Sequence, residues 1–298
     1  MTRAYVDQPV TDIAAATDAA HRAAERWELR PPTLLRQGMN AIFRSGDAVL
    51  RVATPNAPAE VSIRLADMLA DAAIAVPRSV RDEAMRVGPF AVTAWPYIEA
   101  VDVPVDWSEV GAMVRRVHEI DANTLPDGLP RPSPTEFPWW EFDALLAEVL
   151  GGLDSAAAAG LRAASERRDG WDDFVGTDET VICHGDVHPG NVMMSEVGPL
   201  LIDWDLLCAA PRGWDHAPLM TWGERWGGSP ELYPQFAEGY GWSARNDRRA
   251  EAFAELRLVA ATLMRWKAAQ RNPAARPEAE RRLAFWRGDP DAPVWRAQ

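Results

Sequence analysis

The sequence has 298 residues, a formal net charge of −13 and a hydrophobic fraction of 47% that includes 14 tryptophans. Such a composition supports a substantial core and excludes a wholly disordered chain. The acidic balance argues against nucleic acid as the main partner, because phosphate backbones require a clustered basic surface. No apolar run reaches the roughly 18 residues of a membrane helix, and two cysteines do not indicate a disulfide framework. We therefore expect a soluble, cytoplasmic protein with no membrane partner.

The first hundred residues predict a small antiparallel sheet. Short apolar runs at Thr33–Gln37, Ala41–Arg44 and Ala48–Val52 are separated by turn-forming glycine and asparagine, which predicts three consecutive strands. A further strand pair is expected over Val87–Trp95. Between them, apolar residues recur at helical spacing and the pattern ends before Pro77; these residues are Val61, Leu65, Met68, Leu69 and Ala72.

From residue 106 the pattern becomes helical. Asp106 is a plausible N-cap, and the segments with helical periodicity are 106–117, 142–150, 230–240, 248–270 and 277–286. The proline-rich residues 125–138 are predicted to be a connecting loop. The sequence therefore predicts an α+β fold with a small β-rich N-terminal lobe, residues 1–98, and a larger, mainly helical C-terminal lobe, residues 99–298.

A polar segment between two apolar runs carries the clearest chemical signal. Asp186 precedes Asn191 by five positions, and Asp203 follows the apolar residues Leu200–Ile202. The five-residue spacing is that of a kinase catalytic loop, in which the aspartate orients the attacking hydroxyl and the asparagine binds Mg²⁺. Asp203 would be the second metal ligand, because Mg²⁺ prefers oxygen donors. The spacing indicates phosphoryl transfer.

The motif His184-Gly185-Asp186-x-His188-x-x-Asn191, followed by Ile202-Asp203-Trp204-Asp205, resembles the aminoglycoside phosphotransferase and choline kinase superfamily, a branch of the protein-kinase-like fold. The resemblance implies a bilobal enzyme that uses Mg²⁺ and ATP or GTP to phosphorylate a hydroxyl group of a small molecule. It implies that Asp186 is the catalytic base and that Asn191 and Asp203 bind the metal. Asp215 resembles the structural aspartate of the family.

The resemblance also implies that the N-terminal lobe clamps the nucleotide. Arg51 stands where the kinase fold usually has lysine, which keeps the charge but changes the geometry. Glu60, in the following helix, is its candidate partner. The other candidates lie in a turn and in the hinge after the last strand: Gly38, Asn40, Tyr97 and Ile98.

The acceptor is less clearly indicated. The family places it against C-terminal helices, where Trp222 and Glu224 could hold an alkylammonium group. Asp205 could contact substrate or metal, or could only cap a turn. These residues favour an aminoglycoside-like or amino-sugar-like acceptor. A packing role for the tryptophan is the alternative.

Three other functions remain open. A metabolic kinase would act on a choline-like or neutral hydroxyl acceptor. A catalytically dead nucleotide-binding protein would have Arg51 as its lesion. A metal hydrolase would use the alternating His184, Asp186 and His188 as ligands, but it would leave Asn191 and Asp203 without a role.

Overall fold

The computed structural model describes residues 8–125, 142–167 and 180–297. Two compact units contain these residues. The first unit consists of residues 8–105, 119–125 and 191–206, and the second of residues 106–118, 142–167, 180–190 and 207–297. The chain therefore passes from the second unit to the first between Gly190 and Asn191, within the polar motif. These compact units divide the chain differently from the two lobes expected at residues 1–98 and 99–298. The division at residue 98 stays a prediction.

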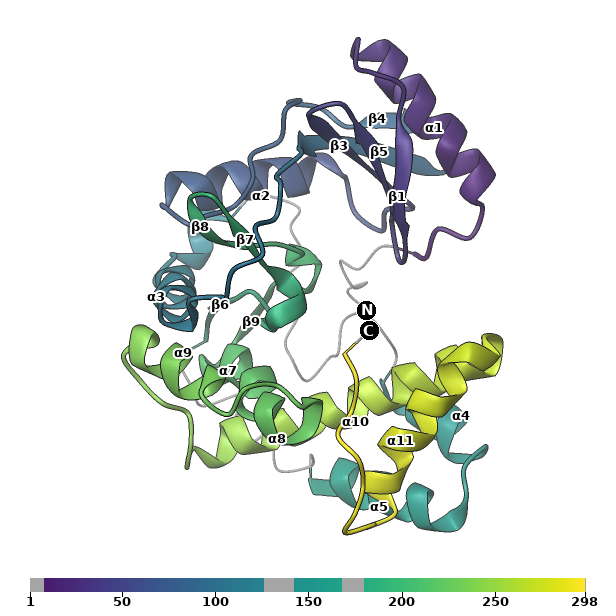
Figure 1. The fold of residues 1–298 in the computed structure, drawn as a ribbon, viewed down its shortest axis with the longest axis vertical. Coiled ribbons are helices and arrows are strands. Elements are labelled where there is room, and N and C mark those ends of the chain that lie inside the picture. Colours follow the sequence, from purple (N-terminus) through teal and green to yellow (C-terminus); the bar gives the residue numbers. More distant parts are fainter. Residues whose placement is uncertain (1–7, 126–141, 168–179, 298) are drawn as a thin grey trace. The chain divides into compact units, whose positions relative to one another are not determined.

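The first unit is built on a five-stranded antiparallel sheet in the order β1-β2-β3-β5-β4 (Figure 1). Its strands are β1 (Thr33–Gln37), β2 (Ala41–Ser45), β3 (Ala48–Ala53), β4 (Met85–Val87) and β5 (Phe90–Pro96). This confirms the three consecutive strands and the following strand pair. Helix α1 (Ile13–Arg26) packs on the sheet, and its alanines share one core with Phe43, Leu50 and Val92.

A helix and a hairpin complete the first unit. Helix α2 (Glu60–Asp71) buries Val61, Ile63, Leu65 and Leu69, and it ends before Pro77 as expected. The hairpin consists of β7 (Val192–Ser195) and β8 (Gly198–Leu201). The Leu201 N–H donates to the Ala75 carbonyl at 3.2 Å, and the Val101 N–H donates to the Met194 carbonyl at 2.9 Å. These bonds explain why residues 191–206 belong to the first unit.

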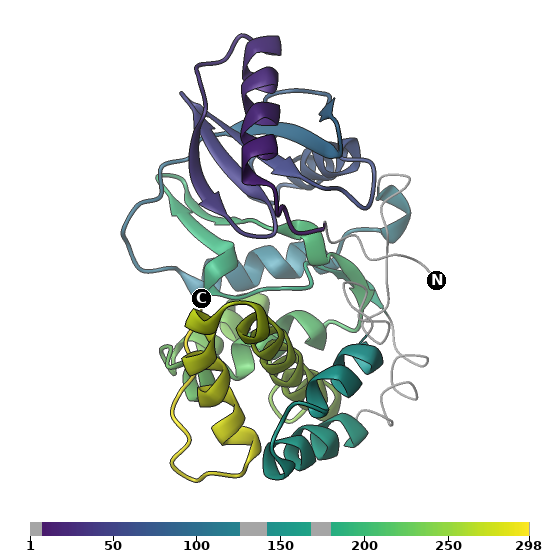
Figure 2. The same ribbon diagram turned by 90° about the vertical axis from the view of Figure 1, so that its right-hand side faces the viewer.

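In the second unit, helices pack around α10 (Arg248–Arg271) (Figure 2). Its neighbours are α4 (Phe142–Leu150), α5 (Ser155–Glu166), α7 (Gly213–Met220) and α11 (Arg276–Trp286). Their core contains the buried side chains Leu161, Trp214, Phe253, Val259 and Leu263. Two short strands, β6 (Val181–Cys183) and β9 (Cys208–Ala210), form an antiparallel pair, and the short helix α8 (Trp222–Trp226) follows α7.

Helices α3 (Trp107–His118) and α9 (Leu232–Tyr240) cross at very close range in the second unit. A Cβ atom at Gly111 would lie 2.0 Å from the Phe236 carbonyl oxygen, and one at Gly239 would lie 1.8 Å from the Ser108 carbonyl oxygen. Only glycine fits at both positions. Asp106 accepts from the Glu109 N–H at 3.1 Å, which confirms it as the cap of α3.

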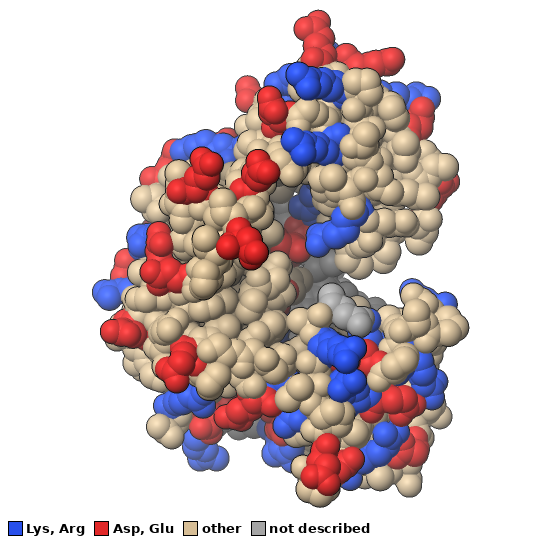
Figure 3. Space-filling model, in the orientation of Figure 1, with Lys and Arg blue, Asp and Glu red and all other residues tan. Residues whose placement is uncertain are grey.

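The helices expected from residues 106, 142, 230, 248 and 277 onward are all found. Most of the predicted loop, residues 126–138, lies outside the described residues. No helix in the described ranges has the length and apolarity to cross a membrane. Acidic and basic side chains are interspersed on the face drawn in Figure 3.

Candidate functional site

The loop that carries Asp186 follows strand β6 in the second unit, and Asp215 fixes its backbone. From the first turn of α7, the carboxylate of Asp215 accepts from the His184 N–H and the Gly185 N–H, both at 2.8 Å. Gly185 has φ +89°, a left-handed conformation that favours glycine. The Asp186 N–H in turn donates to His184 Nδ1 at 3.2 Å. The loop is therefore held before any ligand binds.

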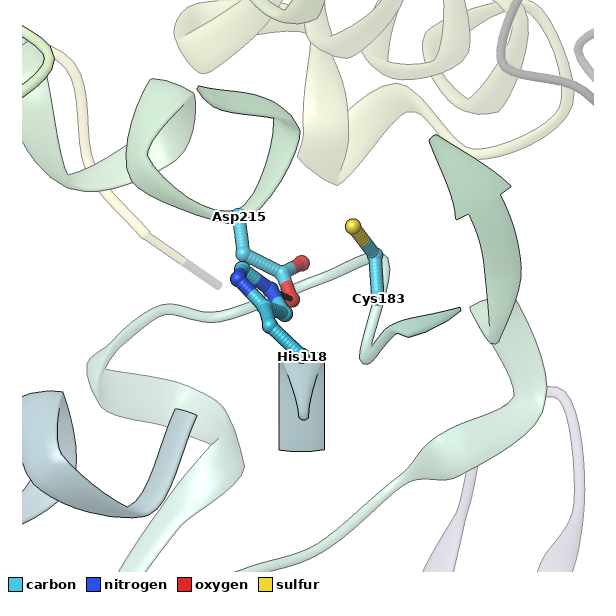
Figure 4. Close-up of side chains that lie close together, drawn as sticks. All are labelled: His118, Cys183 and Asp215. Atoms are coloured by element: carbon cyan, nitrogen blue, oxygen red, sulfur yellow. Dashed lines mark hydrogen bonds and ion pairs between the residues drawn. The ribbon is translucent and has the colours of Figure 1, made fainter. Parts of the chain in front are cut away.

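Asp215 is itself anchored by buried side chains (Figure 4). His118 Nε2 lies 3.0 Å from Asp215 Oδ2, and His118 Nδ1 lies 2.8 Å from the Tyr240 hydroxyl. Burial opposes ionisation of Asp215, but His118, His184 and the Gly185 N–H outweigh it and lower the pKa of this carboxyl. The resemblance to a structural aspartate agrees with this geometry.

His118, Cys183 and Asp215 place possible metal-ligand atoms within 4.8 Å of one another (Figure 4). Burial raises the pKa of the Cys183 thiol well above its ordinary value, so the thiol stays protonated and is a poor ligand. The oxygens of Asp215 already accept hydrogen bonds from the loop and lie beside His118. The cluster is better explained as a support for the loop.

Asp186 lies beside two groups that favour its ionised form. Arg257, from α10, forms an ion pair with Asp186 Oδ1, and it also donates to the Gly185 carbonyl at 3.2 Å. His188 Nε2 lies 3.4 Å from Asp186 Oδ2. Burial opposes ionisation, but Arg257 and His188 outweigh it and hold the pKa of Asp186 well below its usual range. The Asp186 side chain is 22% exposed, so its carboxylate is accessible. The lowered pKa means that this carboxylate is also charged.

His188 and Trp222 form a stack next to this loop. Their rings lie 5.5 Å apart at 8°, and Trp222 also stacks on Trp226 at 5.3 Å and 15°. Trp222 is therefore brought to the Asp186 loop, but its ring contacts other rings of the protein. Glu224 is exposed on α8.

The hydrolase alternative is not favoured by this arrangement. His184 Nδ1 and His188 Nδ1 accept backbone N–H groups, at 3.2 Å and 3.0 Å. Within the described ranges, these two histidines and Asp186 do not group their ligand atoms closely enough to share an ion.

The candidate metal ligands lie at the two ends of the β7–β8 hairpin in the first unit. Val192 pairs with Leu201, so Asn191 and Ile202 follow as neighbours, and the Ile202 N–H donates to the Asn191 carbonyl at 3.0 Å. Asn191 is buried, and Asp203 has φ +65°, which is uncommon for a residue with a side chain. An amide oxygen and a carboxylate fit Mg²⁺, which prefers such donors.

Arg51 pairs with Asp205 in the first unit. Arg51 Nη2 lies 2.5 Å from Asp205 Oδ2, and the side chains are 21% and 13% exposed. Both line a cavity of about 120 Å³, together with Ser62, Leu65, Ala66, Leu69, Val76, Pro77, Trp95 and residues 201–204. The carboxylate of Asp205 contacts Arg51, and the expected contact with substrate or metal stays a prediction.

Glu60 is not the partner found for Arg51. The face of α2 that lines the cavity carries Ser62, Leu65, Ala66 and Leu69. Glu60 lies two residues before Ser62, about 200° around the helix, because each residue turns an α-helix by about 100°. Its carboxylate therefore starts from the other side of α2, and the expected pairing of Glu60 with Arg51 stays a prediction.

The turn and hinge candidates lie at the ends of strands in the same sheet. The Gly38 N–H donates to the Asn40 carbonyl at 3.0 Å, within the β1–β2 turn. Tyr97 directly follows β5, and its N–H donates to the Asp47 carbonyl at 2.7 Å. That donor is used within the fold, and a contact of this hinge with a nucleotide base stays a prediction. Ile98 is the next residue, and none of these four described residues lines the cavity beside Arg51.

Two contacts of the site join positions far apart in the sequence. Arg257 is 71 residues from Asp186, and Asp205 is 154 residues from Arg51. Neither separation corresponds to a motif. The sequence of a helix carries no signal that distinguishes an arginine in an ion pair from a solvated one.

Solved structures of kinase-like proteins share this fold. The spectinomycin phosphotransferase complex with ADP and spectinomycin is 18% identical, with 86% of this chain and 89% of that chain covered and a TM-score of 0.63. A choline/ethanolamine kinase family protein from Mesorhizobium loti is 20% identical, with 95% of both chains covered and a TM-score of 0.61. The GDP complex of aminoglycoside 2'-phosphotransferase-IIIa is 15% identical, covering 91% and 98%, with a TM-score of 0.66.

At these identities the likeness shows the fold, which is the protein-kinase-like α+β class predicted from the sequence. No curated protein matches the sequence. The profile of the phosphotransferase enzyme family matches residues 40–254, which is most of the chain. The protein therefore belongs to the phosphotransferase enzyme family.

Proposed function

We propose that this protein is a kinase that transfers the γ-phosphate of ATP or GTP to a hydroxyl group of a small molecule. The observation that carries the proposal is Asp186, an accessible carboxylate kept ionised by Arg257 on a loop fixed by Asp215. Asn191 follows it at the catalytic-loop spacing, and the hairpin that begins there ends at Asp203. Family membership supports the same reaction class.

Asp186 acts on the acceptor. Its carboxylate accepts a hydrogen bond from the attacking hydroxyl and orients the hydroxyl oxygen toward the γ-phosphorus. It takes the proton as the new P–O bond forms and the bond from the γ-phosphorus to the β–γ bridging oxygen breaks, which releases nucleoside diphosphate. Phosphoryl transfer has a loose transition state in most analyses, so positioning supplies most of the rate. A carboxylate with a lowered pKa suits orientation better than early removal of the proton.

Asn191 and Asp203 would hold Mg²⁺, which, when bound, neutralises the charge that develops on the phosphates. Arg51 contributes a guanidinium that can bind two phosphate oxygens at once. Gly38 and Asn40 cover the phosphates from the β1–β2 turn, and the hinge near Tyr97 and Ile98 lies against the base. These nucleotide contacts are proposed by analogy with the kinase fold.

The favoured acceptor is a hydroxylated amine such as an aminoglycoside or amino sugar. One neighbour in fold is a spectinomycin phosphotransferase, and Trp222 and Glu224 lie on the helix next to the Asp186 loop. The Arg257 guanidinium beside Asp186 favours a second candidate, a neutral acceptor, because it would repel an amine next to the reacting hydroxyl. A choline-like acceptor would have to keep its cation away from Arg257.

An acceptor screen tests the proposal. Purified protein is incubated with Mg²⁺, ATP or GTP, and a panel of aminoglycosides, amino sugars, amino alcohols and neutral polyols, and products are detected by mass. We expect nucleoside diphosphate to form only with both acceptor and Mg²⁺, and one acceptor class to gain a phosphoryl group. Nucleotide binding without transfer across the whole panel would support the catalytically dead alternative instead.

A further inference from the structure

The Arg51–Asp205 ion pair joins strand β3 to the segment that follows the β7–β8 hairpin. Arg51 Nη2 donates a charge-assisted hydrogen bond to Asp205 Oδ2, and both side chains are mostly buried. Apolar neighbours such as Leu65 and Trp95 line the same cavity. In such surroundings water screens charges weakly, so the pair restricts the orientation of the Arg51 guanidinium.

No other acid lines this cavity from helix α2, although that helix was expected to supply one. Its side chains at the cavity are Ser62, Leu65, Ala66 and Leu69. The Ser62 hydroxyl donates to the Ala59 carbonyl of its own helix at 2.7 Å. Along the described residues that line the cavity, the carboxylates come from Asp203 and Asp205.

Asp205 lies two residues after the candidate metal ligand Asp203. The short helix η5 (Trp204–Leu206) contains Asp205, and Trp204 Nε1 donates to the Leu201 carbonyl at 3.2 Å, which ties this turn back to strand β8. One short segment therefore carries both the candidate metal ligand and the partner of Arg51. A substitution at Asp203 or Asp205 is therefore expected to affect the position of the other residue.

We propose that Asp205 is a positioning residue that orients Arg51 toward the phosphates of the bound nucleotide, in the place of an acid on helix α2. The inference rests on the proposed function, since it requires that a nucleoside triphosphate binds beside Arg51. Arg51 supplies the charge, and Asp205 fixes the direction of its planar fork. The chain thus couples its phosphate clamp to its metal-binding segment.

Calorimetric titration measures nucleotide affinity, so it tests the role of Asp205 without requiring turnover. The probes are a non-hydrolysable ATP or GTP analogue with Mg²⁺, whichever the wild type binds more tightly, and the matching nucleoside, which lacks phosphates. The variants are Asp205→Asn, Arg51→Met and their combination, with Asp205→Glu as the conservative change. Glu196→Gln, an exposed acid between β7 and β8, is the charge control, and Glu60→Gln tests the competing assignment.

We expect Asp205→Asn and Arg51→Met each to weaken binding of the Mg²⁺–triphosphate by about tenfold, a coupling typical of contacting charged residues. The double variant should be no weaker than the worse single variant, because both changes remove one interaction. Asp205→Glu should recover part of the loss. Nucleoside binding should stay within about twofold in every variant, which shows that the fold is intact.

The inference is overturned if Asp205→Asn leaves triphosphate affinity unchanged or tightens it, or if the two single losses add in the double variant. A larger loss of triphosphate affinity in Glu60→Gln than in Asp205→Asn would indicate that Glu60, on helix α2, positions Arg51. These outcomes leave the proposed kinase intact. A wild type that binds neither triphosphate would remove the proposed function and the inference together.

Discussion

At the scale of single residues, Asp186 lies between a permanent cation and an imidazole. Arg257 and His188 lower its pKa despite its burial, so the carboxylate is charged throughout the neutral range. Such a group is a weak base, and in the proposed reaction its contribution would come mainly from holding the acceptor hydroxyl in line with the phosphate. Arg257 then controls both the charge and the direction of the Asp186 side chain.

Arg257→Met removes the cation beside Asp186 and should raise the pKa of that carboxyl. The acidic limb of the kcat/KM profile is therefore expected to move to higher pH, since activity requires the ionised form. Arg257→Lys should recover part of this shift. Arg248→Met, an exposed change in the same helix α10, is the control. An acidic limb at the same pH in wild type and Arg257→Met would contradict this assignment.

Asp203 can be tested with little disturbance of its backbone. Its φ of +65° lies in the left-handed region, where asparagine is tolerated and alanine costs about 1–2 kcal/mol. Asp203→Asn should weaken nucleotide binding in the presence of Mg²⁺ by about 10–100-fold, the range seen when groups that support a metal are lost. Titrations with and without Mg²⁺ check this. Equal affinities of wild type and variant with Mg²⁺ present would remove Asp203 from the metal site.

At the scale of elements, the crossing of α3 and α9 supports the catalytic loop. Helix α3 ends at His118, whose Nε2 contacts Asp215, and α9 ends at Tyr240, whose hydroxyl contacts His118 Nδ1. The close approach at Gly111 and Gly239 sets how near the two helix ends can come. A change at this crossing is therefore expected to affect the loop through His118.

Gly111→Ala should destabilise the protein. The added Cβ would meet the Phe236 carbonyl oxygen at 2.0 Å, and the backbones of α3 and α9 would have to separate. We expect a loss of about 1–3 kcal/mol in the free energy of unfolding, as for other overpacked positions. Gly38→Ala is the control, because no atom lies within 4 Å of its added Cβ, and its change should stay within about 0.5 kcal/mol. Urea unfolding that ranks the two variants equally would refute the steric argument.

At the scale of the whole molecule, much of the fold can be predicted from sequence, and so can the positions of the residues proposed for the chemistry. Strands with alternating or apolar runs, helices with large apolar residues and the spacing of Asp186, Asn191 and Asp203 all carry local signals. Helix α1 does not, because its buried face consists of alanines, whose periodicity is weak. The buried face of helix α5 also consists mainly of alanines. The ion pairs of Arg51 and Arg257 depend on tertiary packing, which spacing does not encode.

The pH dependence of stability should reveal the buried His216. Burial, with His118 and Arg212, lowers its pKa to about 3, against 6.5 for an ordinary histidine. Between these values the unfolded chain binds a proton that the folded chain refuses, so stability falls as pH falls, by up to about 1.4 kcal/mol per pH unit. His216→Phe should lack this slope between pH 6 and 4.5, measured by urea unfolding. Parallel curves for both proteins would place the titration elsewhere.

In the proposed reaction, Asp186 orients the acceptor hydroxyl for attack on the nucleotide. The most direct measurement compares wild type and Asp186→Asn for the rate of phosphoryl transfer to the acceptor found in the screen, and for nucleotide affinity, under the same conditions. We expect transfer to fall by about 100-fold or more with nucleotide affinity nearly unchanged. Transfer at the wild-type rate by Asp186→Asn would rule out this role of Asp186.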